Sequence, residues 1–107
     1  MDIETVVKLA NALSDKPKRE SKHPLEIGKS YFIRSVTHYY TGRLTAIVGR
    51  WLVLEDAAWI ADTGRFHDFL RDGKCNEYEA FVAPARIPIG GIIDVTDWPH
   101  PLFKGQK

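Results

Sequence analysis

The sequence contains a single cysteine, Cys75, and its positive and negative charges nearly cancel. One cysteine cannot form an intrachain disulfide or supply a cysteine-based zinc site within one chain, and it favours a reducing, cytoplasmic setting. With 15 Lys and Arg against 14 Asp and Glu, the net charge of +1 creates no overall field that attracts nucleic acid or anionic lipid. Any such binding therefore depends on local clusters of charge.

Long apolar runs are also missing. Stretches free of charged side chains are much shorter than the roughly 20 residues of a membrane-spanning helix, so we expect no membrane partner. The N-terminus carries Asp2 and Glu4 and lacks the basic start of a secretory signal. We expect the protein to remain in the cytoplasm, where it is made.

What is present is enough for one domain over residues 1–107, with 44% hydrophobic residues. The N-terminal segment 2–14 places apolar residues at helical spacing and predicts an amphipathic helix. Segment 15–24 has four Lys or Arg and no apolar residue except two prolines. We interpret it as a basic, solvated linker, and the alternative is an arm that contacts phosphates.

The strongest local pattern predicts a β-hairpin around Gly49-Arg50, because the apolar runs 44–48 and 51–54 flank this short glycine-containing break. Before it, we predict one long strand from residue 29 up to Gly42, bent near that glycine as in small barrels. Residues 57–61 extend the second arm.

Beyond the hairpin, segment 62–73 predicts a short helix that Asp62 or Thr63 caps and Gly73 ends. Residues 77–82 alternate as a strand, and two prolines make 83–89 an edge or irregular strand. A turn at 90–91 leads to a last strand at 92–95. The tail, 98–107, begins with apolar residues that we expect to lie against the barrel or a neighbouring subunit.

Two stretches resemble the Sm-like family of Sm and LSm proteins and bacterial Hfq, whose members form rings and mostly bind RNA. Gly-x-Leu-x-x-Ile at 42–47 and Leu-Val-Leu-Glu-Asp-Ala at 52–57 match its first motif, and 87–93 echoes its second. The resemblance covers most of 25–97. It implies a mainly β, SH3-type, five-stranded bent barrel with an N-terminal helix and a short inserted helix. That insert is longer than the family's usual loop and resembles divergent phage-like and mobile-element members.

The residues with which this family holds a base are replaced here. Where the family usually has Asp and Asn around the hairpin turn, the chain has Val48 and Trp51, and Gly90 stands where Arg is usual. The resemblance therefore implies the fold and a ring, and it does not carry over uridine-type recognition.

Ring formation follows from the family's topology, in which the last two strands lie on opposite edges of the sheet and can pair head-to-tail with sister copies. The candidate edges here are 81–89 and 92–95, although prolines in the first could equally protect it from pairing. The candidate interface residues are Phe81, Val82, Ile87, Ile89, Ile92, Ile93 and Val95.

A basic and aromatic surface could contact phosphates and stack bases. Its candidate residues are Arg34, Tyr40, Arg43, Arg50 and Trp51. The first choice is Arg50 and Trp51 at the hairpin tip. The alternative is that the aromatic side chains are core or interface residues and the arginines are solvated.

The spacing of the histidines and the residues around the cysteine match no motif for metal binding or catalysis. His38, His67 and His100 form no metal-ligand motif, and Cys75 is expected in an exposed loop without a nucleophile motif around it. We therefore predict no enzyme, no metal and no cofactor. The sequence favours a non-catalytic, ring-forming protein with RNA or single-stranded nucleic acid as its first candidate ligand. The alternative is a structural or scaffold protein of a phage or mobile element.

Overall fold

The computed structural model describes residues 23–105, so the predicted helix at 2–14 and most of the predicted linker lie outside the described residues. In chain order, the elements are β1 (Ser30–Ser35), β2 (Tyr39–Val48), β3 (Trp51–Asp62), α2 (Phe66–Asp72), β4 (Glu77–Ala80), β5 (Ala85–Pro88), the 3₁₀ turn η2 (Ile89–Gly91) and β6 (Ile92–Asp97).

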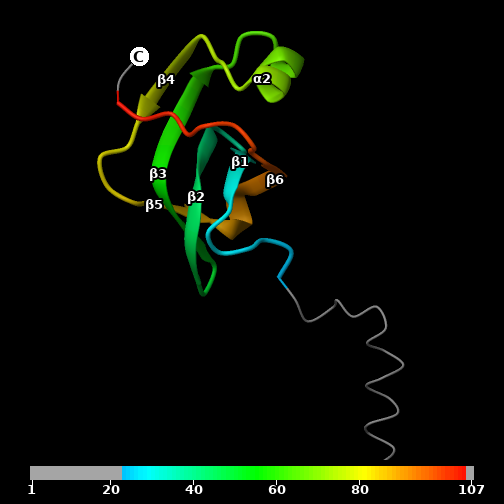
Figure 1. The fold of residues 1–107 in the computed structure, drawn as a ribbon. Helices are drawn as coiled ribbons and strands as arrows, with labels where there is room; N and C mark the ends of the chain where they lie inside the picture. The colour runs from blue at the N-terminus through cyan, green and yellow to red at the C-terminus, as the bar shows by residue number, and fades with distance from the viewer. Residues whose placement is uncertain (1–22, 106–107) are drawn as a thin grey trace, which may run out of the picture.

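The strands form one bent antiparallel sheet in the order β4-β3-β2-β1-β6 (Figure 1). The short strand β5 also pairs with β3, but with its first half, Trp51 to Leu54, whereas β4 pairs with the second half, Ala58 to Asp62. Strands β4 and β5 are therefore one edge interrupted at residues 81–84. The predicted fold class, a mainly β bent sheet with an inserted helix, is confirmed.

One predicted strand is in fact two. The long strand expected from residue 29 to Gly42 breaks at residues 36–38, where a tight turn separates β1 from β2. The Ser35 N–H donates to the carbonyl oxygen of His38 at 2.8 Å, and the Ser35 hydroxyl accepts the His38 N–H at 3.0 Å. The serine thus supplies the turn's hydrogen bonds, and the β-forming residues around it concealed the break.

The sheet bends where β2 passes β3 at Gly42. The pairing register shifts between Thr41 and Arg43, which is a bulge, and Asp56 on β3 adopts φ 52° at this point. A Cβ on Gly42 would lie 3.0 Å from the Leu54 Cβ, so a side chain here would force Leu54 to shift, and glycine allows the close approach of the strands. The predicted bend near Gly42 is present, on β2.

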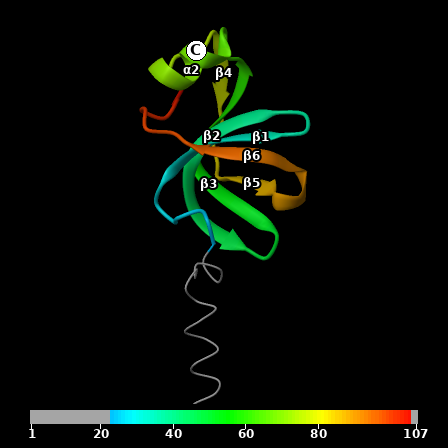
Figure 2. The ribbon, with the colours of Figure 1, turned by 90° about the vertical axis from the view of Figure 1, so that its right-hand side faces the viewer.

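The barrel core lies on the concave face of this sheet. Alternate residues of the central strands point into it, as the period of a strand requires. Its buried members are Tyr31, Ile33, Leu44, Leu52, Leu54, Ala57, Ala85 and Ile87. Figure 2 shows how η2 joins β5 to β6 and how β6 lies beside β1. This connection closes the barrel at one end.

A second core covers the other face of the sheet, where α2 and the C-terminal tail pack on it. Phe69 of α2 lies 4.9 Å from Phe32 and 4.8 Å from Trp98, measured between ring centroids. The tail then runs to β4, where Phe103 contacts Tyr78 at 4.6 Å. The expectation that the tail's apolar residues pack on the barrel is confirmed for Trp98, which is 3% exposed.

Two sequence expectations about this region are wrong. Cys75 is buried in the second core and does not lie in an exposed loop. Helix α2 ends at Gly73 as predicted, but neither Asp62 nor Thr63 caps it: Arg65 occupies the N-cap and makes no side-chain capping bond. The reason is that Asp62 still belongs to β3, where it pairs with Glu77.

Candidate nucleic-acid interface

The predicted hairpin is confirmed, with Gly49-Arg50 as its two-residue turn and Val48 paired with Trp51. Gly49 has φ 59° whereas Arg50 does not enter the positive region, which is the pattern of a type II′ turn. The turn's twist matches that of the flanking strands, so Arg50 is held at the tip of two well-paired strands.

The two stretches that carry the family resemblance lie side by side at this tip. The Ile89 N–H of η2 donates to the carbonyl oxygen of Arg50 at 2.8 Å. Pro88 pairs with Trp51 across the edge of the sheet. Gly90 is exposed in η2 and offers no side chain to a ligand.

A shallow hollow of about 210 Å³ opens on the outer face of the sheet beside the tip. It is lined by Val48, Trp51, Val53 and Arg86. Arg86 lies directly across from Val53 in the pairing of β5 with β3. The sequence interpretation missed Arg86, although the alternation of buried Ala85 and Ile87 around it marks an outward-facing position.

Arg50, Trp51 and Arg86 present their side chains to solvent here. Trp51 is 48% exposed, although tryptophan side chains are usually largely buried. Among residues 23–105, Arg50 and Arg86 have no acidic partner within ion-pair distance. The tip therefore carries two uncompensated guanidinium groups and an accessible indole.

Arg34, by contrast, is already paired. Its Nε donates to Oδ1 of Asp94 at 2.8 Å, a second nitrogen contacts the same carboxylate, and its guanidinium lies 5.3 Å from the centre of the Phe66 ring. The hydrogen bond from Arg34 lowers the pKa of Asp94. Because Phe66 belongs to α2, Arg34 faces the second core and not the hairpin tip.

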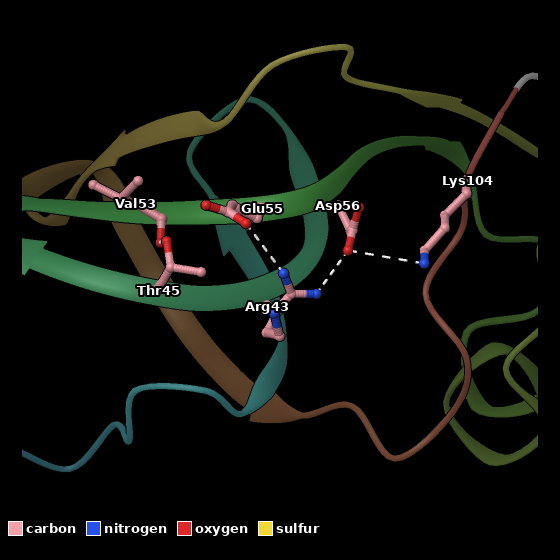
Figure 3. A network of polar contacts seen from close by, with 6 residues as sticks. All are labelled: Arg43, Thr45, Val53, Glu55, Asp56 and Lys104. Atoms are coloured by element: carbon pink, nitrogen blue, oxygen red, sulfur yellow. Dashed lines mark hydrogen bonds and ion pairs between the residues drawn. The ribbon is translucent and has the colours of Figure 1, made fainter.

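Arg43 is also paired, at the bend of the sheet (Figure 3). It donates to Asp56 at 2.6 Å and to Glu55 at 3.1 Å, and Lys104 of the tail lies 3.8 Å from the same Asp56 carboxylate. The hydrogen bond from Arg43 lowers the pKa of Asp56. This cluster neutralises Arg43, and Lys104 of the tail lies beside it at the bend.

Tyr40 is half-buried and packs against the barrel core, with its ring 6.1 Å from that of Phe81. Of the five candidate nucleic-acid residues, the structure therefore brings only Arg50 and Trp51 together as accessible groups. Arg34, Arg43 and Tyr40 lie elsewhere and are engaged within the chain.

The candidate interface residues separate into three groups. Phe81, Val82 and Ile93 are exposed apolar side chains, with Val82 fully exposed and Ile93 62% exposed. Ile89, Ile92 and Val95 line an apolar groove of about 370 Å³ together with Leu25 and Leu52. Ile87 is 3% exposed within one chain, so its side chain belongs to the core.

The histidines named in the sequence do not gather. His38 stacks on Tyr40, and His100 lies against Leu70 at the end of α2. Within residues 23–105, no group of three or more His, Cys, Asp or Glu side chains could hold a metal ion. The described part of the chain also has no helix long and apolar enough to span a membrane.

Of the comparisons with known proteins, the comparison with solved structures gives matches. No protein-family model matches the chain, and no curated protein matches it. The chain is similar to a heptameric archaeal Sm protein, with 20% identity, a TM-score of 0.49, and coverage of 68% of this chain and 90% of that one. It is similar to the SmAP1 heptamer of P. aerophilum, with 20% identity, a TM-score of 0.49, and coverage of 69% and 84%.

The chain's own strand topology identifies its fold. Its last strand, β6, lies on one edge of the sheet, and the preceding strands, β4 and β5, lie on the other. That is the arrangement the family resemblance implies, and β5 and β6 are joined by the short turn η2 beside the hairpin tip. By its strand order, its bent β3 and this closure, the chain has an Sm-like fold.

Proposed function

We propose that the chain is a non-catalytic subunit of a homo-oligomeric ring that binds RNA or other single-stranded nucleic acid through its hairpin tips. The observation that carries the proposal is the pair of unsatisfied sheet edges. Within residues 23–105, β6 pairs only with β1, and β4 and β5 pair only with β3. Because the two edges differ and lie at opposite ends of the sheet, copies would pair head-to-tail and close into a ring.

The prolines that could protect the first edge lie outside strand β4. Pro84 lies in the interruption between β4 and β5, and Pro88 ends β5. Strand β4, Glu77–Ala80, contains no proline, so its outward N–H groups can donate to another strand. Exposed apolar side chains stand beside both edges, with Val82 after β4 and Ile93 on β6.

Native mass spectrometry, with light scattering after gel filtration, tests the assembly. We expect a single species at a multiple of the chain mass, and we expect Ile93→Asp to shift it to a monomer that keeps the far-UV circular dichroism of the folded chain. The matched control is Ile27→Asp, because Ile27 is similarly exposed, at 59%, but lies on neither edge. A wild-type protein that stays monomeric at high concentration contradicts the ring.

Support for the nucleic-acid ligand comes from the hairpin tip. A ring repeats the tip once per subunit, so Arg50, Trp51 and their copies would form a circle of guanidinium and indole groups. Such groups bind single strands through phosphate contacts and stacking, without reading sequence strongly. We expect labelled single-stranded RNA to bind more weakly as salt is raised, and to bind Arg50→Ala and Trp51→Ala more weakly than wild type.

The control for loss of positive charge is Arg65→Ala. Arg65 is exposed at the start of α2, away from the hairpin tip, so this change should leave RNA binding unaltered. Equal weakening by Arg65→Ala and Arg50→Ala would indicate a diffuse charge effect and contradict the assignment of the tip.

The charge balance favours a second candidate, a structural or scaffold ring without specific nucleic-acid binding, such as a phage or mobile element could use. Arg34 and Arg43 are both neutralised by carboxylates, and the chain's net charge is only +1. A ring that binds no single-stranded RNA even at low salt would support this scaffold function.

A further inference from the structure

Side chains from three strands form the hollow beside the hairpin tip. Val48 comes from β2, Trp51 and Val53 from β3, and Arg86 from β5. Because Leu52 and Ile87 alternate with them into the barrel core, these four side chains all point away from it. The paired strands hold the four at fixed relative positions.

The lining defines what the hollow can bind. Two valines provide an apolar floor, the indole of Trp51 provides a flat aromatic surface, and the guanidinium of Arg86 is its one charged group. At about 210 Å³, the hollow is smaller than the roughly 300–1,000 Å³ of pockets that take drug-sized ligands. A single planar ring system suits this size and this lining.

The N–H donors of Arg86 determine which ring system the hollow would prefer. Within residues 23–105 its guanidinium has no carboxylate partner, so its fork of N–H donors is available to a ligand. Guanine presents two adjacent acceptors, O6 and N7, which a guanidinium contacts with two hydrogen bonds. Adenine pairs an acceptor with a donor at that edge, and cytosine presents a donor.

We propose that the hollow binds one unstacked guanine of a single-stranded RNA, with the base stacked on Trp51 and its O6 and N7 bonded to Arg86. The inference rests on the proposed function and adds a base preference to it. Arg50 at the tip contacts the phosphate backbone, so overall affinity and base preference depend on different arginines.

The test measures fluorescence anisotropy with uridine oligomers that carry one central guanosine, adenosine or cytidine, and with the all-uridine oligomer. We expect the guanosine oligomer to bind about tenfold more tightly than the others, because a good bidentate contact discriminates by roughly 1–3 kcal/mol. Inosine, which keeps O6 and N7, should match guanosine. The 7-deazaguanosine oligomer lacks N7 and should lose most of the preference.

Two variants separate the base contact from the charge. Arg86→Ala removes the guanidinium, so the guanosine oligomer should fall to the affinity of the other oligomers, which should lose no more than the effect of one positive charge. Arg50→Ala should weaken every oligomer and keep the preference. Arg86 is exposed and makes no ion pair in the described part of the chain, so neither variant should change the urea midpoint.

The possible results separate the guanine site from the proposed binding of nucleic acid. If no oligomer binds at low salt, the nucleic-acid function fails and the guanine site with it. If all oligomers bind equally, or if Arg86→Ala keeps the guanosine preference, the function stands and the guanine site is overturned. If 7-deazaguanosine binds as tightly as guanosine, Arg86 does not read N7, and the proposed contact is wrong.

Discussion

Replacing Gly73 by alanine should destabilise the fold through the C-terminal tail. Gly73 ends α2 in the left-handed conformation, at φ 73°, and a Cβ there would lie 2.4 Å from Cγ of His100. His100 is held in place because its Nε2 donates to the carbonyl oxygen of Leu70 at 2.8 Å. The tail thus passes directly over the end of the helix.

The size of the effect follows from two separate costs. The left-handed conformation costs a residue with a Cβ about 1–2 kcal/mol, and forcing extra atoms into a packed site costs about 1–3 kcal/mol. Gly73→Ala should therefore lower the free energy of unfolding by about 2–5 kcal/mol. His100→Ala alone loses the hydrogen bond to Leu70, which costs about 1 kcal/mol, and the edge-to-face contact with Trp98 at 4.8 Å between ring centroids, which costs about 0.5–1.5 kcal/mol.

The double variant isolates the clash. With both changes present, the methyl group at position 73 has no imidazole to meet, so only the backbone cost and the lost contacts of His100 with Leu70 and Trp98 remain. We expect the double variant to be about 1–3 kcal/mol more stable than the sum of the single effects predicts. Urea unfolding followed by circular dichroism, on all four proteins, measures this difference. Additive effects, within about 0.5 kcal/mol, would refute the contact between tail and helix end.

Two further predictions concern single polar side chains. The Thr41 hydroxyl is fully buried and has no hydrogen-bond partner within residues 23–105, so Thr41→Val should leave the urea midpoint unchanged or raise it; a clear loss of stability would contradict the missing partner. Since Arg34 lowers the pKa of Asp94, this pair's contribution is present above about pH 4, the carboxyl's unfolded pKa, and is lost as pH falls through the lower folded value. Urea midpoints below about pH 4 should therefore fall less steeply in Asp94→Asn than in wild type.

The parts of the fold that the sequence predicts correctly have local signals. The hairpin follows from Gly49-Arg50 between two apolar runs, and the end of α2 follows from Gly73 after a short amphipathic segment. The break between β1 and β2 has no such signal. It depends on the Ser35 hydroxyl, whereas the residues around it, Val36 and Thr37, favour a continued strand.

The candidate site is only partly predictable because ion pairing depends on contacts between distant segments. Arg34 and Asp94 are 60 residues apart, and nothing near either residue in the sequence shows that β1 and β6 are neighbours. Arg50 and Trp51 could be selected in advance, since side chains in and beside a hairpin turn tend to face solvent. Arg86 could have been found from strand alternation, but its place beside Trp51 required the pairing of β5 with β3.

The second core limits where a ligand can bind. Phe69 and Trp98 close one face of the sheet between α2 and the tail, and both are almost fully buried. The concave face is filled by the barrel core around Leu44 and Leu54. The two sheet edges and the hairpin tip remain as the surfaces on which strand geometry fixes the side chains. If the edges are occupied by sister copies, the tip is the surface left for nucleic acid, and its two arginines, Arg50 and Arg86, have no carboxylate partner in the described part of the chain.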